Sequence, residues 1–166
     1  MCDHETTFVK SEMGLYQAFG PITPEAIVRT AAAILQESLV RGDALTNPED
    51  AARFLQMALA NEKNEHFAVL FLNNKHQVLS FERLFFGTVD GTTVHPRVVV
   101  QKALEYNAAS VILAHNHPSG HSEPSQADRD VTERLVNALN LIDVRVLDHL
   151  IVSQSGWESL SRRGWV

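Results

Sequence analysis

Several features that mark specialised classes of protein are missing from this sequence. Its 166 residues contain one cysteine, Cys2, which excludes an internal disulfide and favours a reducing compartment. No apolar run reaches the length of about 18 residues that a membrane-spanning helix needs. The N-terminus has neither a basic start nor an apolar core, so it does not fit a secretory signal. These absences predict a cytoplasmic protein without a membrane span.

Basic residues are also few. The 14 Lys and Arg residues are outnumbered by 20 Asp and Glu residues, which gives a net charge of −6. Nucleic-acid-binding proteins usually carry a basic patch or stripe, whereas the dense basic spot here is the pair Arg162-Arg163. The charge therefore weighs against a broad phosphate-binding surface and leaves a small local patch open. The length and the 45% apolar content are ordinary for one globular domain with a core.

The most informative segment that is present runs from His115 to Asp128. The apolar residues 110–114 before it predict a buried strand, and side chains at i and i+2 of a strand point to one face. His115 and His117, at the end of this strand, can therefore face one metal ion. Start signals and apolar periodicity predict a helix beginning near Ser125. Because i and i+3 are neighbours on a helix, Ser125 and Asp128 share a face, and Asp128 can close the site.

This pattern suits a catalytic zinc ion. Two histidines and one carboxylate supply three ligands and leave a fourth position for water, although other divalent ions are also permitted. A bound water whose pKa is lowered toward about 7 is a nucleophile at neutral pH. Simpler roles stay open for two residues. Ser125 suits the N-cap of the helix, and Asp128, beside Asp130, could be a solvated residue of the first turn.

The other histidines fit simpler roles. His121 would make a three-histidine site, but the Pro-Ser-Gly insert before it predicts an exposed loop. We expect His149, beside Asp148 in a late strand, to be a hydrogen-bonded structural residue. Asn116 is expected either in solvent or in contact with the ligands from behind. Turn or surface positions are expected for His4, His66, His76 and His95.

Periodicity and turn signals predict the order of the elements. The predicted elements are an irregular or partly ordered arm (1–20), a helix from Thr23-Pro24 to Gly42, a helix from Asn47-Pro48, a strand (66–72), a turn (73–76), a strand (77–86), a helix (95–107) with Val99, Ala103 and Leu104 facing inward, the strand and helix of the metal segment, a strand (144–152) and a short edge strand in the tail (156–166). Helices interleaved with a mixed sheet predict an α/β domain of the three-layer kind. Residues 87–94 are expected to form a surface turn, with a lid as the alternative.

The metal segment resembles the signature of JAMM (MPN-plus) metalloproteases, which reads His-x-His, seven residues, Ser-x-x-Asp. It is more similar to the RadC-like branch of that family, through Val94–Arg97, His115–Gly120 and Asp148–Val152. The resemblance covers the chain from about Ala44 to the C-terminus. It implies a three-layer α/β/α mixed sheet of the JAB/MPN type, related to the cytidine-deaminase fold.

On this resemblance the chain divides into an N-terminal arm with a helix (1–44) and a metal-binding domain (45–166). The family also implies roles for two further residues. Glu65 matches the glutamate that acts as general base, although spacing alone favours a solvated carboxylate there. Ser125 matches the serine whose hydroxyl stabilises the oxyanion. The other carboxylates that could act as the base are Glu62, Glu82 and Glu123.

The function that the resemblance implies is zinc-dependent hydrolysis of a peptide, isopeptide or related amide bond, with a peptide or protein as substrate. A DNA-associated role is the first alternative, because longer RadC-like proteins carry a helix-hairpin-helix segment before this domain. The first 45 residues here show no such glycine-rich hairpin, so binding to nucleic acid is not expected. A non-catalytic MPN-type interaction module is the second alternative, and the complete metal motif argues against it. Metallo-β-lactamases need a different motif, and an amidohydrolase barrel needs about 250 residues.

Overall fold

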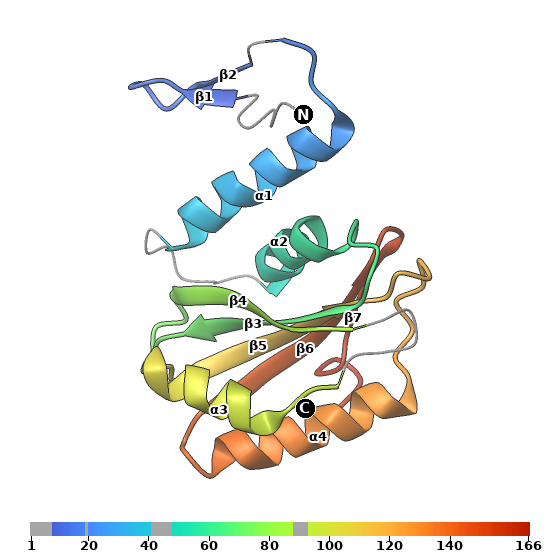
Figure 1. Ribbon diagram of the computed structural model, residues 1–166. Helices are drawn as coiled ribbons and strands as arrows, with labels where there is room; N and C mark the ends of the chain where they lie inside the picture. Colours follow the sequence, from blue (N-terminus) through green and yellow to red (C-terminus); the bar gives the residue numbers. More distant parts are fainter. Residues whose placement is uncertain (1–7, 19, 41–47, 88–92) are drawn as a thin grey trace.

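The computed structural model describes residues 8–18, 20–40, 48–87 and 93–166. Figure 1 shows a twisted sheet with helices on both of its faces. The elements in chain order are β1 (Phe8–Lys10), β2 (Tyr16–Ala18), α1 (Pro24–Val40), α2 (Pro48–Leu59), β3 (His66–Leu72), β4 (Val78–Phe86), α3 (Pro96–Glu105), β5 (Ser110–Asn116), α4 (Gln126–Asn140), β6 (Arg145–Ser153) and β7 (Gly156–Ser159).

The main sheet has five strands in the order β4-β3-β5-β6-β7. The β5–β6 pair is parallel, and α4 makes the crossover between these two strands. The other neighbouring pairs of this sheet are antiparallel. Because β3 runs against β5, the start of β3 and the end of β5 lie at the same edge of the sheet. This edge carries the segment that the sequence marks as a metal site.

Each face of the sheet has its own apolar core. On one face, Phe54 and Leu55 of α2 pack against alternate strand residues such as Leu70 and Ala114. On the other face, Leu135 and Leu139 of α4 join Val99 of α3 and the strand residues Phe71 and Leu113. β5 is buried along its whole length because it is the middle strand between two covered faces. The three-layer α/β/α mixed sheet that the sequence predicts is therefore confirmed.

The N-terminal part differs from the prediction. The sequence predicts an irregular or partly ordered arm over residues 1–20, whereas β1 and β2 form an antiparallel hairpin with Phe8 opposite Ala18. Gly14 turns the chain between them at a φ of 78°, which a residue without Cβ adopts without strain. α1 begins at Pro24 as predicted and packs against α2 and β4. In Figure 1, α1 lies outside α2, so it forms an additional layer over that face.

Most other elements match the predicted order, with small changes at their ends. The helix predicted over 95–107 ends at Glu105, and its Leu104, expected to point inward, is 60% exposed. The predicted edge strand in the tail is β7. The predictions for Cys2, His4, Gly42, Asn47 and the greater part of the 87–94 turn lie outside the described residues. None of the helices in the described ranges has the length and apolar character needed to cross a membrane.

Candidate metal centre

Two elements, β5 and α4, converge at the edge of the sheet where β5 ends. β5 delivers His115 as its penultimate residue, and His117 follows the strand by one position. α4 begins at Gln126 after the connecting loop and brings Asp128 in its first turn. Because β5 alternates its side chains, His115 and His117 share the face that α4 covers. The sequence prediction of one face for both imidazoles agrees with this arrangement.

The imidazoles of His115 and His117 and the carboxylate of Asp128 form a tight cluster. The two Nε2 atoms lie 2.9 Å apart. His115 Nε2 is 3.0 Å from Oδ1 of Asp128, and His117 Nε2 is 3.6 Å from Oδ2. Among the described residues, His115, His117 and Asp128 form the group whose possible ligand atoms are close enough to hold a metal ion. These atoms all lie within 4.8 Å of one another. Two imidazole nitrogens and a carboxylate are a donor set that suits Zn²⁺.

The outer hydrogen bond of His117 fixes which of its nitrogens faces the cluster. Its Nδ1 lies 3.0 Å from the backbone carbonyl of His121, which can only accept. Nδ1 must therefore carry the proton, and in a neutral ring Nε2 is left with a lone pair. The nearby carboxylate of Asp128 is the main cause that raises the pKa of His117, and the charge of Glu65 also contributes. The ring is thus oriented for metal ligation by a backbone atom.

Ser125 is the N-cap of α4 and forms a capping box with Asp128. Its Oγ accepts from the backbone N–H of Asp128 at 3.2 Å and donates to Oδ2 of the same residue at 2.6 Å. The Asp128 carboxylate also accepts the backbone N–H of Ser125 at 2.6 Å. Burial alone would raise the pKa of Asp128, but the close contacts with His115 and His117 and the hydrogen bond from Ser125 outweigh it and hold this pKa well below its usual range. Asp128 is therefore an ionised, oriented carboxylate rather than a solvated residue of the first turn.

Asn116 lies on the opposite face of β5 and fastens the turn that carries Glu65. It is fully buried, so the solvent alternative is wrong, and its side-chain hydrogen bonds go to the turn before β3 rather than to the candidate ligands. Its Oδ1 accepts the backbone N–H of His66 at 2.8 Å, and its Nδ2 donates to the carbonyls of Glu62 and Asn64 at 3.3 and 3.0 Å. The residue between the two histidines thus ties the end of β5 to the start of β3.

Glu65 comes directly before β3 at the edge where the cluster lies. In the register of β3 and β5, Phe67 is opposite His115. Continuing this antiparallel register by two residues places Glu65 opposite His117 and on the same face. Glu65 is also partly buried. The structure therefore brings the carboxylate predicted as general base to the edge that holds the two histidines.

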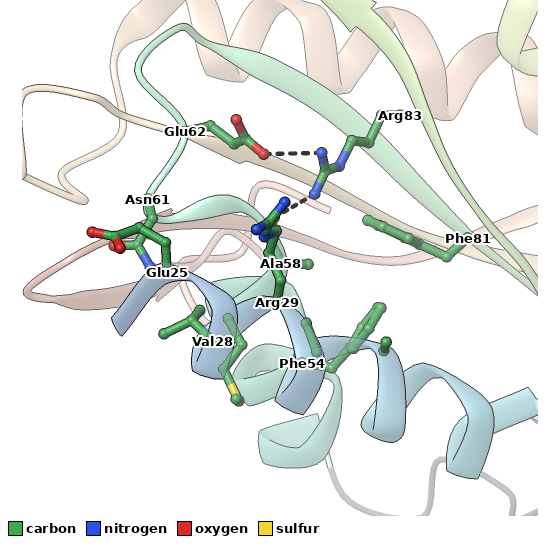
Figure 2. Close-up of a pocket in the computed structure, with 12 residues that line it drawn as sticks. Glu25, Val28, Arg29, Phe54, Ala58, Asn61, Glu62, Phe81 and Arg83 are labelled. Carbon is green, nitrogen blue, oxygen red and sulfur yellow. Dashed lines mark hydrogen bonds and ion pairs between the residues drawn. The ribbon is translucent and has the colours of Figure 1, made fainter. Parts of the chain in front are cut away.

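The competing carboxylates are engaged elsewhere. Figure 2 shows Glu62 facing Arg83, with an ion pair of 2.9 Å, in a cavity of about 360 Å³ between α1, α2 and β4. No member of the histidine–aspartate cluster lines this cavity. Glu82 accepts a hydrogen bond from Tyr106, and Glu123 accepts two from Arg163 at 2.7 and 2.8 Å. These contacts hold the three alternative carboxylates to Arg83, Tyr106 and Arg163.

The loop from His117 to Ser125 is fastened at several points. His121 has an exposed side chain that is outside the cluster, so it takes part through its carbonyl alone, which sequence reasoning did not foresee. Ser155 donates to the carbonyl of Gly120 at 2.7 Å. The pair between Glu123 and Arg163 ties the same loop to the C-terminal turn. These contacts hold the loop that joins the two ligand-bearing elements.

Sequence reasoning placed His149 in a structural role but missed its contact with a ligand. His149 is fully buried in β6, and its Nε2 lies 2.9 Å from Nδ1 of His115. Burial holds the pKa of His149 well below its usual value, so the ring is neutral. Its Nδ1 lies 2.6 Å from the hydroxyl of Thr132 in α4. The spacing of Thr132, four residues after Asp128, was the available signal that it shares a helix face with a ligand.

Comparison with known protein families gives a consistent result. The family model described as "RadC-like JAB domain" matches residues 45–165. Similar curated proteins include a UPF0758 protein of Tolumonas auensis, 51% identical over 142 residues, which are 86% of this chain and 63% of that protein. A UPF0758 protein of Thioalkalivibrio sulfidiphilus is 55% identical over 131 residues, which are 79% of this chain and 59% of that protein. A UPF0758 protein of Vibrio cholerae is 50% identical over 140 residues, which are 84% of this chain and 88% of that protein.

The first two of these relatives are longer than the stretch of this chain that they match. The matched stretch of this chain spans 63% and 59% of the length of the first two relatives. The names of the three relatives state no activity. The match contains all three residues of the cluster as well as Glu65 and Ser125. α1 and the β1–β2 hairpin lie before it.

Proposed function

The chain belongs to the RadC-like JAB domain family, and from this premise we propose that it is a zinc-dependent hydrolase of the JAMM type. The bond cleaved is a peptide, isopeptide or related amide bond. One observation carries the proposal: two imidazole Nε2 atoms and a buried carboxylate converge at one edge of the sheet. An ionised aspartate packed against two histidines is costly to bury unless it is neutralised, and a divalent cation is well suited to do so.

The residues present fit a zinc ion. His115, His117 and Asp128 would hold it, which leaves one position of a tetrahedral site for water or substrate. When bound, zinc supplies a Lewis acid that makes water a nucleophile at neutral pH. The outer hydrogen bonds of the two imidazoles keep their rings in place, as is usual for histidine ligands.

Glu65 is proposed as the general base. Its carboxylate accepts the proton of the attacking water and passes it to the leaving nitrogen, which needs a group that is partly exposed and close to His117. Ser125 is proposed as the donor to the oxyanion that forms at the scissile carbonyl. Its hydroxyl proton points to Asp128 in the structure, so this role requires the hydroxyl to rotate toward the substrate.

The proposed substrate is a peptide or protein, and the proposed location is the cytoplasm. A DNA-associated role is disfavoured because the basic pair near the C-terminus, Arg162 and Arg163, forms ion pairs within the chain. Arg162 pairs with Glu49 at 2.7 Å, and Arg163 pairs with Glu123 and Glu158 at 2.7 and 3.1 Å. Their charges are balanced within the chain, which leaves little for phosphate groups.

Metal content is the first test of this proposal. We expect about one zinc ion per chain by elemental analysis of the purified protein, and loss of zinc in His117→Ala and Asp128→Ala. Matched controls are His121→Ala and Asp130→Ala, because both residues are exposed, lie close to the ligands in sequence and are outside the cluster. Zinc that is retained in both ligand variants, or absent from the wild-type protein, would reject the metal site.

Hydrolysis is the second test. We expect cleavage of a fluorogenic peptide or of an isopeptide-linked conjugate by the zinc-loaded protein, and a loss of kcat in Glu65→Gln with zinc content unchanged. Glu62→Gln is the control, since Glu62 pairs with Arg83 in the cavity of Figure 2. A zinc-loaded protein that cleaves neither substrate class, or a Glu65→Gln variant with full activity, would argue for a non-catalytic role.

A further inference from the structure

A continuous chain of buried hydrogen bonds leaves His115 on the side away from Asp128's carboxylate. His115 Nδ1 is 2.9 Å from His149 Nε2, and His149 Nδ1 is 2.6 Å from the hydroxyl oxygen of Thr132. That hydroxyl lies 2.5 Å from the backbone carbonyl of Asp128. His115 is 1% exposed and the other two side chains are 0% exposed, so water does not compete for these bonds. The chain begins at one metal-ligating residue and ends at another.

The direction of this chain is set at its Asp128 end. A carbonyl oxygen has no proton to give, and two oxygens 2.5 Å apart need a proton between them. The Thr132 hydroxyl must therefore donate to the Asp128 carbonyl. Its single proton is then used, so it can only accept from His149. The proton of His149 consequently lies on Nδ1.

The same reasoning gives the direction of the hydrogen bond between His149 and His115. A neutral imidazole has one N–H, so His149 Nε2 is an acceptor when Nδ1 carries the proton. His115 Nδ1 must then be the donor in the 2.9 Å contact between the two rings. A neutral His115 with its proton on Nδ1 has a lone pair on Nε2, the atom that faces Asp128 and His117.

We propose that Thr132 and His149 are positioning residues that lock His115 in the tautomer needed for metal ligation, through a relay that is anchored on the backbone of Asp128. This inference rests on the proposed function insofar as the ligand is zinc, but the directions of the hydrogen bonds follow from contacts within the protein itself. The relay also links two ligands to each other. α4 supplies both the carboxylate of Asp128 and the carbonyl that fixes the ring of His115.

Ring contacts support the same orientation. Phe67 stacks on His115, with an interplanar angle of 12°, and meets His149 edge-on at 67°. Phe67 therefore packs against both rings and restricts their rotation. Hydrogen-bond partners behind metal-bound histidines typically change metal affinity by about 10- to 100-fold when they are removed. An effect of this size is expected at Thr132, although its side chain is not in the cluster.

The test compares Thr132→Val with Thr132→Ser. Valine keeps the shape but removes the acceptor for His149 Nδ1–H, and a buried N–H without an acceptor is unfavourable. The proton of His149 is then expected to move from Nδ1 to Nε2 of His149. This displaces the proton of His115 from Nδ1 to Nε2 of His115, where the proton competes with the metal. We expect zinc affinity, measured by chelator competition, to fall about 10- to 100-fold in Thr132→Val and to stay near wild type in Thr132→Ser.

A direct readout uses the metal-free protein. Long-range ¹H–¹⁵N NMR spectra of the histidine rings, recorded where His115 and His149 are neutral, should show the proton on Nδ1 in both rings of the wild type. In Thr132→Val the His115 signal should shift toward the Nε2–H form. A wild-type His115 with its proton on Nε2, or a folded Thr132→Val variant with unchanged tautomer and zinc affinity, would overturn the relay. If the wild type binds no zinc, the proposed function fails, and the histidine spectra still show whether Thr132 sets the proton positions of His149 and His115.

Discussion

At the scale of single residues, neighbouring positions of β5 serve opposite faces of the sheet. His115 points toward α4 and the histidine–aspartate cluster. Asn116 points to the other face and holds the turn before β3. The two functions are adjacent in sequence because side chains alternate along a strand. The geometry of the candidate site therefore depends on Asn116, although Asn116 has no contact with the ligand atoms.

Replacement of Asn116 should weaken the fold and the site together. In Asn116→Ala the backbone N–H of His66 and the carbonyls of Glu62 and Asn64 lose their partner. We expect a loss of about 1 to 3 kcal/mol in the free energy of unfolding, measured with urea. The exposed Asn74 of the β3–β4 turn gives a control, because Asn74→Ala should change stability by less than about 0.5 kcal/mol. Equal effects of the two variants would contradict this role of Asn116.

Ser125 allows capping and catalysis to be separated. Ser125→Ala should cost about 1 kcal/mol of stability as an N-cap replacement, whereas Ser125→Gly should cost only a few tenths. Both variants lose the hydroxyl, so both should lower kcat by about 10²- to 10³-fold if it stabilises the oxyanion. Thermal unfolding and kinetics on the same samples distinguish the roles. Activity that follows stability, with Ser125→Gly nearly unaffected, would indicate a cap alone.

The candidate metal ligands could be predicted from sequence because their geometry is local. His115 and His117 are two residues apart on a strand, and Ser125 and Asp128 are three apart at a helix start. The relay through His149 could not be predicted in the same way. It depends on the parallel pairing of β5 and β6, which places Leu113 opposite His149, and no short-range pattern specifies that register.

At the scale of elements, α4 contributes to both the site and the core. Its first turn holds Ser125 and Asp128 in the capping box, and its later turns bury Leu135 and Leu139 against the sheet. Packing of the later turns fixes the axis of the helix, and the cap fixes where the helix begins. The position of Asp128 relative to β5 follows from the two together.

The packing of α4 can be tested far from the cluster. Leu139→Ala removes a fully buried side chain and should cost about 2 to 5 kcal/mol in urea unfolding. Leu141 is 87% exposed directly after the helix, so Leu141→Ala is the matched control and should be nearly neutral. Similar losses in both variants would mean that the buried face of α4 has been assigned wrongly.

Sequence patterns predicted the elements of the sheet more accurately than those of the N-terminus. β3 and β5 contain uninterrupted apolar runs at residues 67–72 and 111–114, and such runs are the strongest local signals. β1 and β2 have three residues each, too few to show alternation. In α3, the buried pair Val99 and Ala103 fixes the inner face. Leu104 lies about 100° further around the helix and so points to solvent.

At the scale of the whole molecule, the proposed zinc ion would join parts of the chain that are otherwise separate elements. It would tie the end of β5 to the start of α4, and Asn116 connects the same edge to the start of β3. α1 and the β1–β2 hairpin lie on the far side of α2, away from α4. The metal is therefore expected to stabilise the sheet and α4 more than the N-terminal elements.

Zinc should raise the melting temperature of the protein. At a free zinc concentration about 100-fold above Kd, binding adds about 2.7 kcal/mol to the free energy of unfolding. For a chain of this size that corresponds to a shift of roughly 5 to 10 °C by differential scanning fluorimetry. A chelator should reverse the shift, and His117→Ala should abolish it. An unchanged melting temperature with and without chelator, in a protein shown to bind zinc, would contradict this coupling.

The alternation of β5 has a consequence for how this family can change its length. Inserting or deleting one residue within Ser110–Asn116 would move every later side chain of the strand to the opposite face of the sheet. His115 and Asn116 would then exchange faces. The ligand would enter the α2 core and the amide would face the cluster. The seven residues between His117 and Ser125 lie outside both elements, but this loop orients His117 through the backbone carbonyl of His121. We therefore expect functional homologues to keep the length of this loop, and to accept substitutions in β5 but no insertions or deletions there.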